Sequence, residues 1–276
     1  MRHSYLSDED QLSYTDSGAG LPVVFLHPTP LNGDYWEPMI ARLEGVRAIV
    51  PDLRGHGDSQ LGQKLPAGAF ASVPDAPVLT MAQLASDVVT LLDLLGVREA
   101  VFAGCSIGGY VLLELWRRAP ERMRGLAFVC SKPQPDTVDN QQRRAAIIAQ
   151  VRAEGVAKFF DGMAQTLIGA MAGQHRLELV AKARMQMGLS VEALTAVQAG
   201  LAVRPDSVPT VSSIAAPVLA IAGGEDSSVS PVEMEAFCAA PGGCTSSVIH
   251  DAGHLAALEQ PEKVAVLMSP WLEQFR

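Results

Sequence analysis

Short, dense apolar runs separated by helical segments constrain the fold of this chain more than any other feature. Six such runs occur, at residues 22–26, 46–50, 100–103, 126–130, 218–221 and 246–249. Most of them lack the in/out alternation of a half-buried strand, which is typical of parallel strands covered by helices on both faces. The pattern predicts an α/β fold with a mostly parallel central sheet flanked by helices.

Two of the intervening helices carry clear start signals. Thr80-Met81-Ala82-Gln83 has the form of a capping box, and the helix that it opens runs to about Leu95, where Gly96 ends it. Ser230-Pro231-Val232-Glu233 is a second capping box, with proline at the first helical position. These helices fill two of the intervals between the predicted strands.

The alternation of strands and helices stops between about residue 131 and residue 209. Helical patterns occupy that interval, at residues 140–154, 156–171, 176–187 and 190–201, with no strand signal between them. We therefore predict one core domain built from residues 1–130 and 210–276, with a helical lid inserted at 131–209. The Ala-, Gly- and Pro-rich segment 61–78 is expected to be a long loop that could line the entrance to the site.

Charge and hydropathy limit the possible partners. The net charge of −9 and the lack of a run of Lys and Arg argue against nucleic acid, because an acidic surface repels phosphates. No apolar run reaches the ~18 residues of a membrane span, and the acidic start at residues 1–10 is not a secretory signal. We expect a cytoplasmic protein without membrane association, and no pattern specifies an oligomeric state.

The cysteines and histidines give no sign of a metal site. There are four cysteines and six histidines, without a CxxC pair or another metal-ligand spacing. Cys105 and Cys130 lie in apolar runs, where a free thiol packs as a small hydrophobic group. His250 and His254 are four residues apart, but Gly253 lies between them and no helical pattern surrounds them. We expect neither a metal nor a cofactor.

A candidate nucleophile lies between a predicted strand and a predicted helix. The segment Gly104-Cys105-Ser106-Ile107-Gly108-Gly109 contains G-x-S-x-G, which is a weak signal alone but acquires meaning at a strand-to-helix turn. A tight, strained turn holds the serine hydroxyl clear of the sheet, and glycines allow neighbouring backbones to approach. The helix that follows directs its N–H groups and positive dipole end at the site. Ser106 is therefore predicted to be the nucleophile.

A serine nucleophile needs a base and an orienting carboxylate. His254 follows the last predicted strand and is favoured as the base over its rival His250, which is read as strand-end packing. Glu225 and Asp226 both follow the preceding strand. Asp226 is favoured because its shorter side chain fits a tight loop, while helix capping remains an open reading for Glu225.

The chain resembles the α/β-hydrolase superfamily, especially its small esterases, enol-lactonases and cofactor-free haloperoxidases. Five segments carry the resemblance in order: Phe25-Leu26-His27 with Gly33 and Trp36, residues 52–59 (DLRGHGDS), residues 104–109, residues 223–226 and Gly253-His254. The resemblance implies an α/β-hydrolase fold with Ser106 as nucleophile, His254 as general base and Asp226 as its orienting acid. It also implies that His27 and His56 hold loops beside the site.

The predicted oxyanion loop departs from the usual His-Gly of the family. Here it reads His27-Pro28-Thr29-Pro30, and Pro28 has no N–H to donate. Thr29 does have one, and Pro30 biases Thr29 toward an extended conformation. We therefore expect the N–H groups of Thr29 and Ile107 to form the oxyanion hole, where each donor is typically worth roughly 2.7–4 kcal/mol in the transition state.

The predicted function is cleavage of carboxylic esters of small to medium, neutral substrates through an acyl-enzyme. A lactonase or enol-lactonase, a C–C bond hydrolase and a perhydrolase would use the same triad, and a catalytically silent ligand-binding relative is a further alternative. Apolar lid residues could form an acyl pocket, although helix packing is the preferred reading for each: Phe159, Phe160, Met163, Leu167, Met171, Met185 and Met187. Four basic lid residues could hold a carboxylate, although a solvated helix face is preferred for most: Arg143, Arg144, Arg152 and Lys158.

Overall fold

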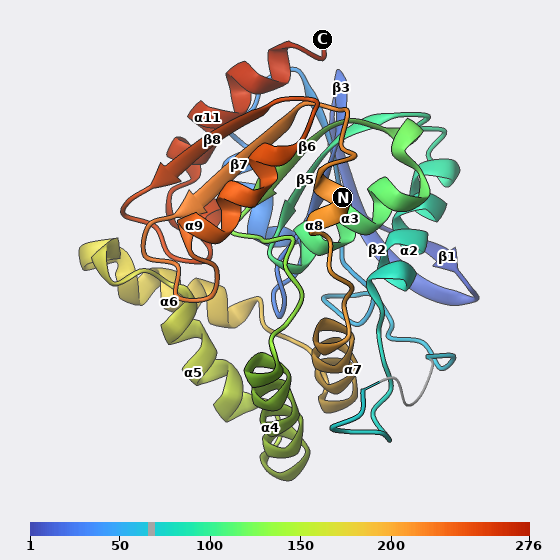
Figure 1. Ribbon diagram of the computed structural model, residues 1–276, viewed down its shortest axis with the longest axis vertical. Coiled ribbons are helices and arrows are strands. Elements are labelled where there is room, and N and C mark those ends of the chain that lie inside the picture. The colour runs from blue at the N-terminus through green and yellow to red at the C-terminus, as the bar shows by residue number, and fades with distance from the viewer. Residues whose placement is uncertain (66–69) are drawn as a thin grey trace.

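The protein is built around one eight-stranded sheet, seen in a computed structural model that describes residues 1–65 and 70–276. The strand order is β1-β2-β4-β3-β5-β6-β7-β8 (Figure 1). The strands are β1 (Arg2–Ser7), β2 (Asp10–Gly18), β3 (Leu21–Leu26), β4 (Val46–Pro51), β5 (Ala100–Cys105), β6 (Met123–Val129), β7 (Val218–Gly223) and β8 (Cys244–Ile249). All neighbours from β4 to β8 pair in parallel, which confirms the predicted α/β class.

The first two strands of the sheet are not among the predicted ones. β1 and β2 form an antiparallel hairpin, and β2 also pairs antiparallel with β4. Polar residues predominate in both, because the hairpin forms the edge of the sheet and much of it stays exposed. Such strands lack the dense apolar runs that reveal the buried strands.

Helices pack in two groups around the sheet. α2 (Met81–Leu94) packs against α3 (Ile107–Arg118), while α1 (Glu37–Ile40), α10 (Ala256–Glu259) and α11 (Pro261–Glu273) pack together. The Thr80 hydroxyl caps α2 as predicted, and Ser230 with Glu233 forms a full capping box at α9 (Pro231–Met234). The remaining short elements are η1 (Gly33–Trp36), η2 (Pro120–Arg122) and η4 (Glu235–Ala239).

The chain between β6 and β7 is helical, and its longer helices gather at one end of the molecule (Figure 1). It contains α4 (Val138–Glu154), α5 (Ala157–Leu167), η3 (Ala170–His175), α6 (Arg176–Met185), α7 (Val191–Ala202) and α8 (Val208–Val211). The single helix predicted over 156–171 is wrong, because the backbone becomes extended at Ile168. At this break the carbonyl of Leu167 accepts from the N–H of His254 in the loop after β8, and the N–H of Gly169 donates to Glu259 of α10.

The predicted 61–78 loop is only partly described, since residues 66–69 lie outside the described residues. Its described part includes Phe70 and Val78, which are buried against Ile148 of α4 and Ala199 of α7. No described residue of this segment lines the cavity that contains Ser106. The described part of the loop therefore supports the helices and does not form an entrance lip.

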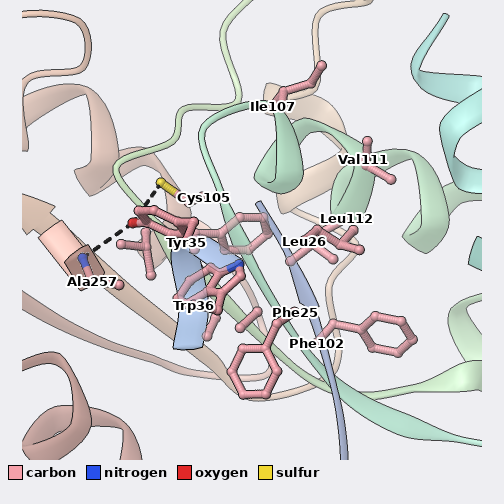
Figure 2. Close-up of a cluster of buried hydrophobic side chains, with 14 of the residues drawn as sticks. Phe25, Leu26, Tyr35, Trp36, Phe102, Cys105, Ile107, Val111, Leu112 and Ala257 are labelled. Carbon is pink, nitrogen blue, oxygen red and sulfur yellow. Dashed lines mark hydrogen bonds between the residues drawn. The ribbon is translucent and has the colours of Figure 1, made fainter. Parts of the chain in front are cut away.

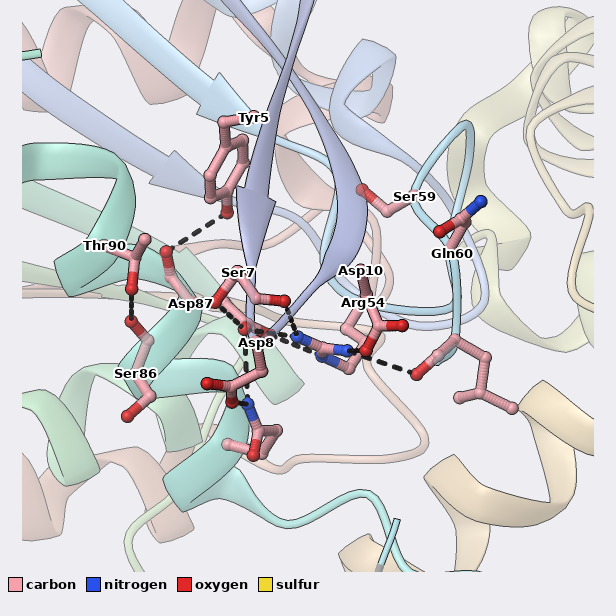
Figure 3. Close-up of polar contacts among 12 residues, drawn as sticks. Tyr5, Ser7, Asp8, Asp10, Arg54, Ser59, Gln60, Ser86, Asp87 and Thr90 are labelled. Carbon is pink, nitrogen blue, oxygen red and sulfur yellow. Dashed lines mark hydrogen bonds and ion pairs between the residues drawn. The ribbon is translucent and has the colours of Figure 1, made fainter. Parts of the chain in front are cut away.

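A buried polar network joins the N-terminal hairpin to α2 and to the loop after β4 (Figure 3). Both carboxylate oxygens of Asp87 accept hydrogen bonds from the Arg54 guanidinium, at 2.7 and 2.9 Å. Arg54 also bonds to Asp10 (2.5 Å) and to the carbonyl of Ser7. Arg54 belongs to the segment 52–59, so the network fixes a loop that runs beside the Ser106 site.

The described cysteines are of two kinds. Cys105 and Cys130 are buried free thiols, as predicted, whereas Cys238 and Cys244 form a disulfide that the sequence analysis did not anticipate. Among the described residues, no helix has the length and apolar character needed to cross a bilayer.

Candidate active site

Ser106 occupies a strained turn between β5 and α3. Its φ is 52° and its ψ −116°, a conformation that costs free energy for a residue other than glycine. The flanking glycines permit this turn: a Cβ on Gly104 would lie 2.5 Å from the backbone of Gly108, and one on Gly108 would lie 2.3 Å from the carbonyl oxygen of Leu26. The close approach predicted for these glycines is confirmed.

His254 and Asp226 meet at the same edge of the sheet. His254 Nδ1 lies 2.7 Å from Asp226 Oδ2, and both side chains are buried. The other carboxylate oxygen, Oδ1, accepts from the backbone N–H groups of Ser228 (2.7 Å) and Val229 (3.0 Å). The carboxylate is therefore fixed on one side by its own loop and presents the other side to the imidazole.

Charge and burial act in opposite directions on this pair. Burial alone would lower the pKa of His254, but the Asp226 carboxylate raises it above its usual value through charge and a hydrogen bond. Burial would raise the pKa of Asp226, but His254 and the two loop N–H groups hold it below its usual value. Asp226 is thus ionised at neutral pH, and it increases the basicity of the imidazole.

Ser106, His254 and Thr29 line one cavity of about 280 Å³. Larger hollows lie elsewhere, including one of about 630 Å³ bordered by Asp93, Arg98 and Arg122, but it contains none of the predicted site residues. The smaller cavity is therefore the candidate active site. Among the described residues, no cluster of three or more His, Cys, Asp or Glu side chains could hold a metal ion.

The loop of Thr29 is held in place by two histidines. His56 Nε2 lies 2.9 Å from the Thr29 hydroxyl, and its Nδ1 donates to the carbonyl of Arg54. His27 Nε2 accepts from the N–H of Leu53 at 2.9 Å. Burial lowers the pKa of His27 to about 4 and that of His56 to about 3, so both are neutral. They act as loop supports, in agreement with their predicted roles.

Ile107 is the first residue of α3, and its side chain is buried. The N–H at this position has no acceptor within the helix. Thr29 is also nearly buried, and it contributes to the wall of the cavity. Of the two predicted donors, Ile107 therefore follows Ser106 directly in the chain, and Thr29 lines the same cavity as Ser106.

A buried tyrosine connects the segments beneath the site (Figure 2). The hydroxyl of Tyr35 donates to Cys105 Sγ and accepts from the N–H of Ala257, each at 3.3 Å. The Cys105 thiol in turn donates to the carbonyl of His254 at 3.7 Å. These contacts tie the residue before Ser106 to the loop of His254.

The two rivals considered at the sequence level lie elsewhere. His250 does not line the cavity that contains Ser106. It is exposed in the turn after β8, so its predicted role in strand-end packing is wrong. Glu225 accepts from the N–H of Met171 at 2.8 Å, and Asp226 is the carboxylate that contacts His254. Glu225 thus contacts the helical segment between β6 and β7.

Glu259 has no predicted role, but its carboxylate holds the His254 loop in place through hydrogen bonds. Its carboxylate accepts from the N–H of Gly169 (2.8 Å), of Gly253 (3.0 Å) and of Leu255 (3.1 Å). A Cβ on Gly253 would lie 2.4 Å from the nitrogen of Gly169, so the two backbones are in close contact. Burial raises the pKa of Glu259, although the three N–H donors oppose that shift. No sequence signal distinguishes this glutamate from those on the surface.

Replacing Glu259 by Gln should lower kcat/KM for ester hydrolysis by about 10- to 100-fold, because the loop of His254 loses acceptors and shifts. The negative charge of Glu259 also raises the pKa of His254, so the acid limb of the pH–rate profile should move to lower pH. The measurement is kcat/KM from pH 5 to 9, with Glu262→Gln as the surface control. A lower melting temperature with an unchanged pH profile would show that Glu259 only stabilises the fold.

The lining of the cavity corrects the interpretation of the lid residues. Arg143 and Arg144 line the cavity, whereas Arg152 pairs with Asp75 at the surface and Lys158 is 80% exposed. The solvated-face reading therefore holds for Arg152 and Lys158 and is wrong for Arg144, which is half-buried, whereas Arg143 is exposed and also lines the cavity. Of the predicted apolar pocket residues, Met163 and Leu167 line the cavity, while Met171 and Met185 are exposed.

A strained serine at a strand-to-helix turn and a histidine–aspartate pair at one sheet edge are features of hydrolytic α/β enzymes. Residues 22–261 match the alpha/beta hydrolase fold family, and the chain belongs to that family. The resemblance inferred from the sequence is thereby confirmed.

Several relatives are similar over most or part of the chain. A thermophilic esterase from Thermogutta terrifontis, solved with malate bound, is 31% identical with a TM-score of 0.87, covering 99% of this chain and 98% of that chain. The 3-oxoadipate enol-lactonase 1 of Acinetobacter baylyi is 26% identical over 92% of this chain and 89% of that protein. A non-heme chloroperoxidase of Kitasatospora aureofaciens is 31% identical over 46% of this chain and 42% of its own length. These relatives support a hydrolase acting on small molecules.

Proposed function

We propose that the protein is a serine hydrolase that cleaves carboxylic esters of small substrates through an acyl-enzyme on Ser106. The observation that carries this proposal is that the strained Ser106 and the Asp226-bonded His254 line the same cavity. A hydroxyl nucleophile and an imidazole held in one tautomer by a carboxylate are the groups that acyl transfer needs.

In the acylation step, Ser106 Oγ attacks the ester carbonyl carbon and His254 Nε2 accepts the hydroxyl proton. Nδ1 keeps its proton, which it donates to Asp226. The negative charge that develops on the carbonyl oxygen is stabilised by the N–H groups of Thr29 and Ile107. The tetrahedral intermediate then collapses, the C–O bond to the alcohol breaks, and His254 returns the proton to the leaving alkoxide.

In the deacylation step, a water molecule replaces the alcohol. His254 takes a proton from the water as its oxygen attacks the acyl carbon. The second tetrahedral intermediate collapses by breaking the bond to Ser106 Oγ, which regains the proton from His254. The carboxylic acid leaves, and the enzyme returns to its starting state.

Residues 131–209 are proposed to act as the lid over a core formed by residues 1–130 and 210–276. Support comes from the cavity wall, to which this segment contributes Arg143, Met163 and Leu201 opposite Ser106 and His254. In this arrangement the core provides the reacting groups and the lid selects the substrate.

A lactonase is the second candidate, because the similarity to an enol-lactonase extends over most of both chains. Ring opening of a lactone uses the same attack on an acyl carbon, and the leaving alkoxide stays attached to the acyl group. The similarity to an esterase of known structure favours open-chain esters equally well. Relative rates on the two substrate types separate them.

The test is a panel of 4-nitrophenyl esters of graded acyl length beside a set of γ- and δ-lactones. We expect turnover that is highest for short acyl chains, because the cavity of about 280 Å³ excludes long ones. A fluorophosphonate should transfer its phosphonyl group once to the intact protein, with loss of fluoride. Failure to hydrolyse any member of the panel, together with no labelling, would refute the proposed activity.

A further inference from the structure

The cavity beside Ser106 carries a charge opposite to that of the whole protein. Lys132, Arg143, Arg144 and Arg204 line it, with Asp136 as their anionic neighbour, although the chain has a net charge of −9. A partly enclosed pocket with one sign of charge focuses the field and attracts ligands of the other sign. Because these basic groups line the same cavity as the proposed nucleophile, an anionic group on the substrate would balance their charge.

Two of the arginines share a single carboxylate. Asp136 Oδ1 accepts from Arg204 at 2.6 Å, and the same carboxylate also accepts from Arg144. Burial would raise the pKa of Asp136, but the two guanidinium groups hold it below its usual value, so it is ionised. The side chains of Asp136 and Arg204 are only 2% and 3% exposed. Arg144, Arg204 and Asp136 together therefore retain one uncompensated positive charge. A charge of this kind raises the free energy of a buried site unless a counterion pairs with it.

Arg204 is fixed more rigidly than a surface arginine. Its guanidinium lies 4.5 Å from the centre of the Tyr110 ring, and it donates to the carbonyls of Leu201 and Gln134. Its Nε is buried and has no hydrogen-bond partner among the described residues. The cationic group is thus held in place before any ligand arrives, which lowers the entropic cost of binding.

Helix α4 presents a polar face to the same cavity. Asn140, Arg143, Arg144 and Ile147 line the cavity at positions i, i+3, i+4 and i+7, which form one face of a helix. Arg144 donates to Gln198 Oε1 at 2.9 Å as well as to Asp136. Arg143 has no ion-pair partner among the described residues. Lys132, in contrast, is paired with Glu233.

We propose that Arg143 and Arg144, supported by the Asp136–Arg204 pair, bind a carboxylate on the substrate away from the bond that is cleaved. The protein would then prefer esters or lactones that carry a free carboxylate, and the inference rests on the proposed ester hydrolysis at Ser106. Guanidinium groups match the planar geometry of a carboxylate by forming two parallel hydrogen bonds. This proposal differs from the neutral substrate that the sequence predicts.

The size of the cavity limits this substrate. About 280 Å³ corresponds to roughly nine waters at ~30 Å³ each, and so to a small acid with a comparable number of non-hydrogen atoms. A short chain with a carboxylate at one end and the ester at the other fits this volume.

The test uses three 4-nitrophenyl esters of equal chain length, with a terminal carboxylate (the adipate monoester), a terminal carboxamide or a terminal phosphonate. We expect kcat/KM to be at least tenfold higher for the carboxylate than for the carboxamide. In Arg143→Gln and in Arg144→Gln this ratio should fall by about 3- to 10-fold, toward one, mainly through KM. Arg152→Gln, on the same helix but paired with Asp75 at the surface, should keep the wild-type ratio.

Each outcome of this test decides a separate question. Equal rates for carboxylate and carboxamide, or an unchanged ratio in both arginine variants, would overturn the inference and leave ester hydrolysis intact. A preference for the phosphonate would overturn the carboxylate assignment in favour of a phosphorylated substrate. Arg144→Lys keeps the positive charge but cannot form the two parallel hydrogen bonds of a guanidinium group. Partial recovery of the carboxylate-to-carboxamide ratio in this variant would support carboxylate binding even if Arg144→Gln folds poorly. No turnover of any ester, with no fluorophosphonate labelling, would refute the proposed function itself.

Discussion

Replacing Ser106 by Ala should abolish ester turnover, with kcat falling by about 10⁶-fold, and should remove labelling by a fluorophosphonate. The reason is that the acyl-enzyme cannot form without the hydroxyl, while the cavity and the His254–Asp226 pair remain in place. Ala lacks the hydroxyl but keeps the Cβ, so the turn at φ 52° is no more strained than before. The variant should therefore fold and bind substrate normally.

The matched control for this experiment is Ser227→Ala. Ser227 lines the same cavity but follows Asp226 in an exposed loop. We expect this control to keep its labelling and at least a third of the wild-type kcat. Initial rates on a 4-nitrophenyl ester and intact-protein mass spectrometry give both measurements. Residual activity above about 1% in the Ser106 variant, after exclusion of contaminating esterase, would mean that another residue attacks the ester.

The sequence predicted the parts of the fold that follow from local patterns. Dense apolar runs located β3 to β8, and the capping residues Thr80 and Ser230 located the starts of two helices. Ser106 was identifiable because a strained turn requires glycines at fixed offsets along the chain. Each of these signals is carried by residues close together in sequence.

Other features depend on contacts between distant segments and gave no local signal. Glu259 resembles any glutamate near a helix start, yet it is buried because three N–H groups from two loops converge on it. The helix predicted through residue 171 ends at Leu167 because the chain there bonds to the His254 loop. Arg143 and Arg144 resemble a solvated helix face, and Arg143 is indeed exposed, but the position of α4 makes both of them line the cavity.

These distant contacts also connect the helical segment between β6 and β7 to the loop of the proposed base. The N–H of His254 donates to the carbonyl of Leu167 at 2.9 Å, and Glu259 joins Gly169 to Gly253. The break between α5 and η3 is therefore part of the framework that orients His254. A movement of α5 would therefore shift the backbone of His254, the residue proposed as the base.

Replacing Asp226 by Asn should lower kcat/KM by about 10⁴-fold, because the new side chain enforces the wrong tautomer of His254. The Asp226 Oδ1 position accepts from the N–H groups of Ser228 and Val229, so the amide oxygen should occupy that place. The amide NH₂ would then face His254 Nδ1 as a donor. The ring proton moves to Nε2, which can no longer accept the proton of Ser106.

The same variant should change the pH dependence of the reaction. In the wild type, Asp226 raises the pKa of His254 above its usual value, and kcat/KM should fall with a slope of one as the pH drops through this raised pKa. Without the Asp226 carboxylate, burial becomes the dominant influence on His254 and lowers its pKa. The midpoint of the residual activity should therefore move to lower pH. Asp251→Asn, which removes a surface charge paired with Lys263, should leave both the rate and the midpoint unchanged. An Asp226→Asn enzyme that retained its rate within tenfold and its wild-type midpoint would show that Asp226 does not orient the base.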